Sequence, residues 1–371
     1  MVSSCDAVLR DAALAGVLCD EPGVVVVRHA LGPRRDDGLR RTVLDAGGVV
    51  EDARLRLDRS CLGCALREDA LPAVVAAAAS GRWRRVVLAL PVTAEPVAAV
   101  QALTSGAVGG RPVSAWAHVD GVVAVAHGPA LEEDLFGDDL WVERGQGLDE
   151  ADARSVGETV ARQLEEADAV LLGGAPSAAG AAAVRHLAGP RTEQLPLHET
   201  SGLEVLRRRR PAAAGGARSA GLLGLQHPGA QDEHGVWTTL LDSPLPLHPE
   251  RLLERTAELG GSPLRARGSF WLPTRPTTAC AWDAGGGQLA VGRLGAWGDG
   301  DRRTRLLVTG RGDGGAARVE RAFAEALATP AEMARGGWPG AEEDGFSAWL
   351  GEVRPETGST GAPDGGRGRT T

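Results

Sequence analysis

The chain has 371 residues, of which 43% are hydrophobic, and it carries a formal net charge of −9. This length allows two domains with hydrophobic cores, and the negative charge argues against a protein that coats nucleic acid, so we expect no DNA partner. Every basic side chain other than histidine is arginine, because the sequence contains no lysine. The chain therefore cannot work as an ordinary P-loop GTPase or ATPase, in which a lysine reaches the β- and γ-phosphates.

The N-terminal residues and the cysteines indicate a cytoplasmic protein. Charged residues interrupt the first thirty positions, so no secretory signal is expected. Five cysteines, two of them in a C-x-x-C motif, are typical of metal or redox thiols in a reducing compartment rather than of a disulfide framework. The longest weakly charged stretch, residues 169–184, contains three glycines and a proline, so we expect no membrane span.

The first half of the chain alternates apolar runs with helical patterns, which is typical of a parallel sheet covered by helices. Four apolar runs predict strands that are buried on both faces, namely Val24–Val27, Val86–Leu90, Val122–Ala126 and Ala169–Leu172. The spacing of Leu71, Val74, Val75 and Ala78 predicts an amphipathic helix over residues 66–80. A further helix is predicted after Ser155, which would form a capping box with Glu158.

The second half of the chain has a different pattern. It follows a segment whose side chains are too polar and too small to form a hydrophobic core. Residues 207–221 begin with four arginines, which predict a solvated loop or, as the alternative, a contact to phosphate or ribosomal RNA. Strands are then predicted at 236–241, 264–272, 278–284, 288–294 and 305–309, with helices at 249–259 and around 319–327. We therefore expect an α/β domain at 1–206, a linker at 207–221, an α+β domain at 222–352 and a disordered tail at 353–371.

The C-x-x-C motif formed by Cys61 and Cys64 is the strongest local chemical signal. It stands just before the helix that is predicted to begin near Leu66, where backbone N–H groups stabilise thiolates. Two sulfurs are half of a tetrahedral zinc site, so zinc would need further ligands. The sequence offers Cys19, His29, Asp58 and Cys280 without choosing among them. A redox pair and two merely buried thiols are the alternatives.

The residues around this motif resemble the CobW family of metal-handling GTPases and metallochaperones. The segment from Cys61 to Asp69 is similar to the family's GCICCTLRED signature, with Ser60 for its first glycine and Gly63 for its middle cysteine. Residues 120–123 resemble the DGVVTVVD strand, and residues 152–168 resemble the helix that ends in Q-I-E-x-A-D. Residues 247–252, 265–272, 303–308 and 338–349 resemble the CobW C-terminal domain, so the resemblance covers roughly residues 20–352.

The departures from the family fall on nucleotide-binding elements. The N-terminus has no GxxxxGK[ST] run. Residues 89–96 replace the acid of the family's E-x-x-G-x-x-x-P stretch by alanine and its glycine by valine. The guanine-reading NKxD is replaced by residues 173–176, which read Gly-Gly-Ala-Pro. The resemblance therefore implies a P-loop-NTPase-like, mostly parallel sheet with a degenerate nucleotide site, followed by an α+β CobW C-terminal domain.

One branch of the family shares these losses. The chain is similar to the branch that recruits a hibernation-promoting factor to the ribosome when zinc is scarce. That resemblance implies a zinc-responsive adaptor with Cys61 and Cys64 as metal ligands, the hibernation factor and the ribosome as partners, no bound GTP and no enzymatic activity. The alternative is a metallochaperone with residual GTP hydrolysis through unrecognised residues.

Overall fold

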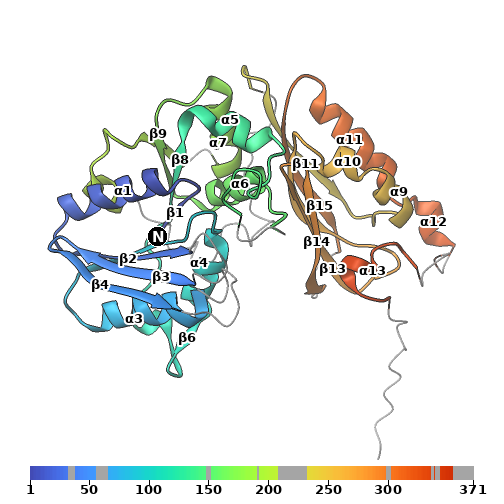
Figure 1. Ribbon diagram of the computed structural model, residues 1–371. Helices are drawn as coiled ribbons and strands as arrows, with labels where there is room; N and C mark the ends of the chain where they lie inside the picture. The colour runs from blue at the N-terminus through green and yellow to red at the C-terminus, as the bar shows by residue number, and fades with distance from the viewer. Residues whose placement is uncertain are drawn as a thin grey trace, which may run out of the picture.

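The computed structural model describes residues 1–31, 38–55, 66–147, 152–189, 192–207, 232–297, 302–335, 338 and 343–353. These residues build two sheets with their helices, which lie side by side in the molecule (Figure 1). The predicted class, a mostly parallel α/β sheet followed by an α+β domain, is confirmed.

Eight strands form the first sheet in the order β10-β9-β8-β1-β5-β2-β3-β4. Neighbouring strands run parallel except where β3 pairs with β2 and with β4. The strands are β1 (Val2–Ser4), β2 (Val24–Leu31), β3 (Leu39–Asp45), β4 (Gly48–Leu55), β5 (Arg85–Ala89), β8 (Val123–His127), β9 (Ala169–Gly173) and β10 (Glu193–Pro196). The four strands predicted from apolar runs are therefore confirmed as β2, β5, β8 and β9.

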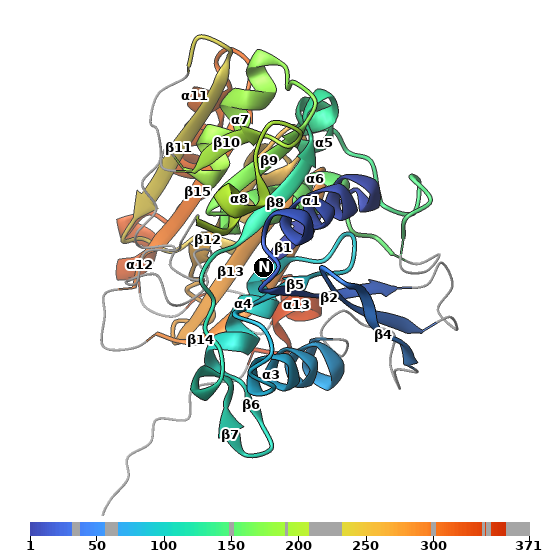
Figure 2. The ribbon, with the colours of Figure 1, turned by 90° about the vertical axis from the view of Figure 1, so that its left-hand side faces the viewer.

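Helices cover both faces of this sheet, because its central strands are apolar on both faces. Val24 and Val26 pack in one cluster with α1, whereas Val25 and Val27 pack in another with α3 and α4. Figure 2 shows α1 beside β1 and β8. The helices are α1 (Ala7–Asp20), α3 (Leu71–Ala79), α4 (Pro96–Ser105), α5 (Leu131–Phe136), α6 (Val156–Glu166), α7 (Ala178–Ala188) and α8 (Gly202–Arg207).

Short elements complete the first domain. A π-helical turn, η2 (Leu66–Ala70), leads into α3, so the helix predicted over 66–80 is present in two parts. The small hairpin of β6 (Ala107–Val108) and β7 (Arg111–Pro112) is followed by the 3-10 turn η3 (Val113–Ala115), and η4 (Gly128–Ala130) leads into α5. The side chain of Ser155 accepts a hydrogen bond from the Glu158 amide, which is half of the predicted capping box.

The second sheet has five antiparallel strands in the order β11-β15-β12-β13-β14. They are β11 (Val236–Ser243), β12 (Arg265–Phe270), β13 (Thr278–Gly285), β14 (Gln288–Ala296) and β15 (Thr304–Arg311). The helices α9 (Pro249–Glu254), α10 (Thr256–Gly260) and α11 (Gly315–Ala326) lie on the side away from the first domain (Figure 1), and α12 (Pro330–Ala334) and α13 (Ser347–Leu350) follow. The single helix predicted over 249–259 is thus two helices, because Arg255 leaves the helical region at φ −104 and ψ 11.

The core of the second domain is aromatic. Trp237, Phe270, Trp282 and Phe346 are almost completely buried together between the sheet and its helices. A hairpin turn at residues 285–287 joins β13 to β14, the strands predicted at 278–284 and 288–294. Most of the predicted linker and nearly all of the predicted tail lie outside the described residues, so the boundaries at 207–221 and 353–371 stay predictions.

Candidate functional site

The order of the first sheet places a crevice between the carboxyl ends of β1 and β8. After β1 the chain continues to β2 on one side, and after β8 it continues to β9 on the other side. Open α/β sheets bind ligands where successive connections diverge in this way, at the carboxyl edge of the strands. In a P-loop protein the phosphates would lie here, against the first amides of the helix that follows the first strand.

The turn between β1 and α1 fills this anion position with a side chain of the chain itself. Asp6 precedes the first residue of α1, and its Oδ1 accepts hydrogen bonds from the amides of Val8 at 2.8 Å and Leu9 at 3.0 Å. The hydroxyl of Ser4 holds the turn in place by donating a hydrogen bond to the carbonyl of Val125 at 2.7 Å. The free N–H groups and positive end of a helix normally attract an anion, and here the Asp6 carboxylate supplies it.

The crevice itself is small and already contains an ion pair. Its cavity has a volume of about 150 Å³ and is lined by Cys5, Asp6, Asp134 and Arg144 among other residues. Ligand pockets typically measure about 300–1,000 Å³, so this cavity is smaller than the usual range. Arg144 pairs with Asp134 at 2.5 Å and with Asp139 at 2.9 Å.

Burial determines the protonation of two groups at this cavity. Burial raises the pKa of the Cys5 thiol well above its ordinary value, so Cys5 is a neutral thiol and not a reactive thiolate. Burial also raises the pKa of Asp134, although Arg144 opposes that shift. Phosphate binding needs a free positive charge and open space, and neither the Cys5 thiol nor the Asp134 carboxyl provides them.

The segment after β5, where the family has its acidic motif, is also occupied by internal contacts. Thr93 has a φ of 66°, in the left-handed region, and its amide donates to the carbonyl of Ser4 at 3.2 Å. Arg154 donates to the carbonyl of Thr93 at 3.0 Å and pairs with the buried Asp152 at 2.8 Å. Glu95, the one acid of this stretch, pairs with Arg162 at 2.5 Å.

The loop after β9, which stands where the family has its guanine-reading NKxD motif, is in close contact with another part of the backbone. Gly174 has a φ of 84°, and its carbonyl oxygen would lie 2.1 Å from a Cβ placed on Gly128. The two backbones therefore touch at a point where only glycine fits. No side chain from residues 173–176 is available there to read a base, since the segment carries only two glycines, an alanine and a proline.

The predicted metal ligands Cys61 and Cys64 lie outside the described residues, as does Asp58. The candidate His29 is described and is 1% exposed on β2. Its Nε2 lies 2.6 Å from Oδ2 of Asp69, and Asp69 also accepts a hydrogen bond from Arg41. Within the described part of the chain, the buried Nδ1 of His29 has no hydrogen-bond partner.

This histidine has the environment of a metal ligand. A ligating histidine usually donates one ring N–H to a carboxylate, which fixes the tautomer and leaves the other nitrogen to bind the metal. Asp69 would do so for His29, and it lies five positions after Cys64 in the same segment of sequence. Sequence reasoning did not single out Asp69, although its place in the C-x-x-C segment was a usable signal.

The fold does not place the other two candidate cysteines, Cys19 and Cys280, near His29. Cys19 is exposed on α1, whereas Cys280 is buried in the core of the second domain, where burial raises its pKa to about 11. Among the residues that the structure describes, no group of three or more histidine, cysteine or acidic side chains could hold a metal ion. The predicted metal site therefore depends on residues that lie outside the described ranges.

A buried ionic cluster joins the two domains beside the carboxyl edge. Glu165 of α6 accepts two hydrogen bonds from Arg265 of β12, at 2.8 Å and 2.9 Å, and both side chains are nearly inaccessible. Arg265 also pairs with Asp283, which Arg162 of α6 contacts at 2.9 Å. The hydroxyl of Ser155 donates to the carbonyl of Gly285 at 2.8 Å. The second domain is thus fixed to the helix that packs beside the degenerate site.

Comparison with known proteins identifies this second domain. Residues 236–327 match the model of the cobalamin synthesis protein cobW C-terminal domain. The second sheet is therefore similar to a CobW C-terminal domain. The match covers β11 through α11, and it confirms the sequence resemblance at residues 247–252, 265–272 and 303–308, whereas residues 338–349 lie beyond it. The matched region supplies Arg265, Arg267 and Asp283, which contact α6.

Two solved structures are similar to the whole chain at low scores. The crystal structure of the Zn(II)-bound YjiA GTPase from E. coli is 13% identical, covers 88% of this chain and 97% of that one, and has a TM-score of 0.35. A Zn(II)-bound triple mutant of YjiA GTPase gives the same coverage and identity with a TM-score of 0.36. No curated protein is significantly similar in sequence. In the described residues, no helix is both long and apolar enough to span a bilayer.

Proposed function

We propose that this chain is a CobW-type, zinc-responsive adaptor that recruits a hibernation-promoting factor to the ribosome and acts by contact rather than by P-loop GTP hydrolysis. The observation that carries the loss of GTP chemistry is the Asp6 carboxylate on the first amides of α1. A phosphate would have to displace that carboxylate, and the chain has no lysine to compensate.

The zinc part of the proposal is supported by His29. Zinc accepts sulfur and imidazole nitrogen in a tetrahedral site, so Cys61, Cys64 and Nδ1 of His29 would supply three ligands. The unpartnered, buried Nδ1 and the carboxylate on the opposite ring nitrogen fit this role. Binding would deprotonate the two thiols and fix the segment before α3, which offers a way to make partner contact depend on zinc.

Titration with a fluorescent GTP analogue tests the loss of nucleotide binding. We expect no saturable signal at high micromolar concentrations, with or without Mg²⁺. A saturable, Mg²⁺-dependent signal at low micromolar concentrations would favour the alternative function, a CobW-type metallochaperone with residual GTP hydrolysis.

Equilibrium zinc titration tests the metal site. We expect about one zinc per chain, no binding after replacement of both Cys61 and Cys64 by serine, and at least about tenfold weaker binding in His29→Ala. Cys19→Ser is the matched control, because Cys19 is exposed on α1. Full stoichiometry in the double cysteine variant would rule out this site.

Co-sedimentation with ribosomes tests the adaptor role. The hibernation factor should sediment with ribosomes at low zinc only when this protein is present, and added zinc should change that dependence in the wild type but not in the double cysteine variant. Equal occupancy of the factor with and without the protein would contradict the proposal.

A further inference from the structure

The outermost strand of the first sheet, β4, has one free side. It pairs with β3, and among the described residues no strand pairs with its other side. Figure 2 shows β4 at the outer end of the sheet, beyond β2. Such a strand presents a row of backbone N–H and C=O groups that another strand can bind. Neither the degenerate nucleotide site nor the proposed zinc ligands belong to β4, so its partner goes beyond the proposed function.

The regular part of β4 is the segment of residues 51–55, which pairs one to one with residues 39–43 of β3. The register shifts only nearer the hairpin, between Val43 and Leu44 of β3, so the bulge does not interrupt this segment. The segment contains no proline, and its three charged side chains are exposed. Bulges and prolines are devices that keep other strands away from the side of a sheet, and residues 51–55 lack both. The middle residue of this free segment is Ala53.

The charges on one face of this segment are not balanced within the chain. Asp52 and Arg54 point to the same face, because side chains two positions apart in a strand do so. Both carboxylate oxygens of Asp52 accept hydrogen bonds from Arg40, at 2.8 Å and 2.6 Å. Arg54 lies directly opposite Arg40, a like charge, and no described carboxylate is within ion-pairing distance of Arg54. Since like charges that face each other destabilise a strand pair, a carboxylate on the outer side of Arg54 would be stabilising.

The same segment of a second copy would supply that carboxylate. When identical strands pair antiparallel about a two-fold axis, one residue faces its own copy, because residues directly opposite each other share a face of the sheet. With Ala53 at the axis, Asp52 of each copy faces Arg54 of the other. With Asp52 or Arg54 at the axis, like charges face each other instead. Only the register centred on Ala53 pairs opposite charges and uses all of residues 51–55.

We propose that β4 pairs antiparallel with β4 of a second copy of this chain, about a two-fold axis at Ala53, so that two eight-stranded sheets become one. Asp52 and Arg54 then form two ion pairs across the axis, and the small side chains of Ala53 meet at its centre. The contact closes after two copies, because both copies use the same surface. A contact of one short strand is smaller than the roughly 1,200–2,000 Å² of a stable interface. The dimer is therefore weak, with a Kd of about 100 µM, and the monomer prevails at low micromolar concentrations.

Sedimentation velocity of the full chain between about 5 µM and about 500 µM tests this assignment. The buffer contains EDTA, so that zinc cannot bridge two chains. We expect a reversible shift from monomer to dimer with a midpoint near about 100 µM. A chain that stays monomeric at the highest concentration would overturn the proposal. Assembly beyond the dimer would also overturn it, because the proposed contact closes after two copies.

Two charge reversals locate the contact on β4. Arg54→Asp and Asp52→Arg should each weaken self-association at least about tenfold, because each places like charges opposite one another. An equimolar mixture of the two variants should associate about as tightly as the wild type, because each variant carries the charges that the other lacks. Arg318→Asp makes the same charge change at an exposed position of α11 and should have no effect. Unchanged association in both single variants, or a mixture that stays monomeric, would refute the proposal, with unfolding at low micromolar concentration showing that each variant is folded.

A disulfide trap measures the register directly. Ala53→Cys, in a chain whose Cys19, Cys61 and Cys64 are replaced by serine, should form an intermolecular disulfide under oxidising conditions. Directly opposite Cα atoms of antiparallel strands are about 4.5–5.5 Å apart, which is within the range of a disulfide. Val49→Cys is the matched control, because position 49 is 64% exposed on the same strand but lies far from its own copy in this register. Cross-linking of the control alone, or of neither variant at concentrations where the chain is dimeric, would overturn the register centred on Ala53.

Discussion

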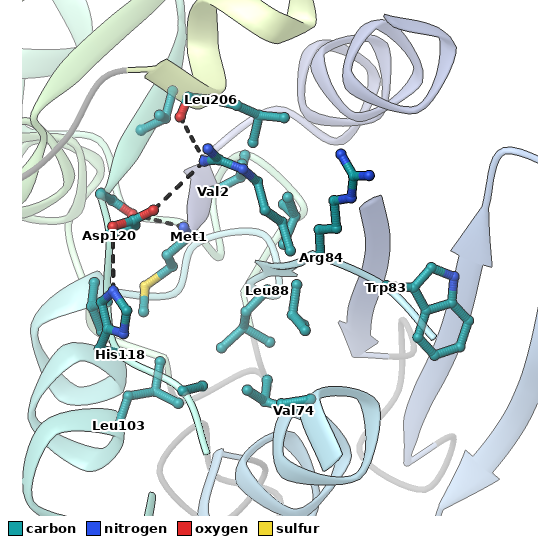
Figure 3. A pocket seen from close by; sticks show the side chains of 18 of the residues that line it. Met1, Val2, Val74, Trp83, Arg84, Leu88, Leu103, His118, Asp120 and Leu206 are labelled. Carbon is teal, nitrogen blue, oxygen red and sulfur yellow. Dashed lines mark hydrogen bonds and ion pairs between the residues drawn. The ribbon is translucent and has the colours of Figure 1, made fainter. Parts of the chain in front are cut away.

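The two edges of the first sheet differ in the space that they leave beside the ends of the strands. At the carboxyl edge, where ligands usually bind, Asp6 caps α1, Asp134 pairs with Arg144, and the remaining cavity is about 150 Å³. At the amino edge, a cavity of about 280 Å³ is lined by Arg84 and Arg85 among other residues (Figure 3). The strand order of this sheet depends on buried apolar runs and not on the residues of the turns, so the turns can change without changing the order of the strands.

The largest expected effect concerns the attachment of the second domain beside the carboxyl edge. Glu165→Ala leaves the buried Arg265 without its bidentate partner, so the free energy of unfolding should fall by about 3–5 kcal/mol, measured by urea denaturation. Asp52→Asn removes an exposed ion pair with Arg40 and should leave stability nearly unchanged. Similar losses in both variants would mean that burial of the Glu165 pair is unimportant.

A smaller loss is expected at the loop that closes the carboxyl edge after β9. The Cβ of Gly128→Ala would lie 2.1 Å from the carbonyl oxygen of Gly174, so this variant should be destabilised by about 1–3 kcal/mol in thermal or urea unfolding. Gly16→Ala is the matched control, because its Cβ meets nothing within 4 Å on α1. That control should gain about 0.5–1 kcal/mol from helix propensity, and equal effects at the two glycines would contradict the close packing.

Removal of the Asp6 cap should cost less, about 0.5–2 kcal/mol, because Asp6→Ala leaves two helix amides without their side-chain acceptor. Asp6→Ser keeps a cap and should lose little stability. If the carboxylate does take the place of an anion, added phosphate should raise the unfolding midpoint of Asp6→Ala more than that of the wild type. Equal responses of the two proteins to phosphate would show that the site is closed in some other way.

The smallest effect is a pH dependence at the domain contact. Burial tends to raise the pKa of Asp283, but Arg265 and Arg162 outweigh burial and lower it. The stability that Asp283 contributes is therefore complete above its unfolded pKa of about 3.9 and is lost as the pH falls through the lower, folded value. Wild type and Asp283→Asn should differ by about 0.5–1 kcal/mol at neutral pH and converge below about pH 4. A difference that is constant with pH would rule out this ionic contribution.

The central strands were predictable from the sequence because burial on both faces leaves a continuous apolar run, as in residues 24–27. The strand β4 was not predicted, because it is exposed at the edge of the sheet and carries charged side chains. Strand β1 was also missed, because three residues are too short to show a pattern. The helix after Ser155 was predictable because its cap and its apolar spacing are both local features.

The candidate site was predictable only in part. The absence of nucleotide-binding motifs could be read directly from the sequence. Asp6 stands just before a helical pattern, which is a usable signal for a helix cap, but we did not predict this role. The contact between His29 and Asp69 could not be derived from the sequence, because 40 positions separate the two residues and the contact joins strand β2 to the turn η2. The partners predicted from the resemblance remain predictions.

The pair of Glu165 and Arg265 also has a consequence for the order in which a newly made chain folds. The two residues are 100 positions apart, so at about 5–20 residues per second the α6 helix leaves the ribosome about 5–20 s before its partner strand. During that interval the Glu165 carboxylate has no arginine to neutralise it and must stay hydrated. Burial of this carboxylate therefore has to wait until β12, which carries Arg265 and Arg267, has been made and packs against α6.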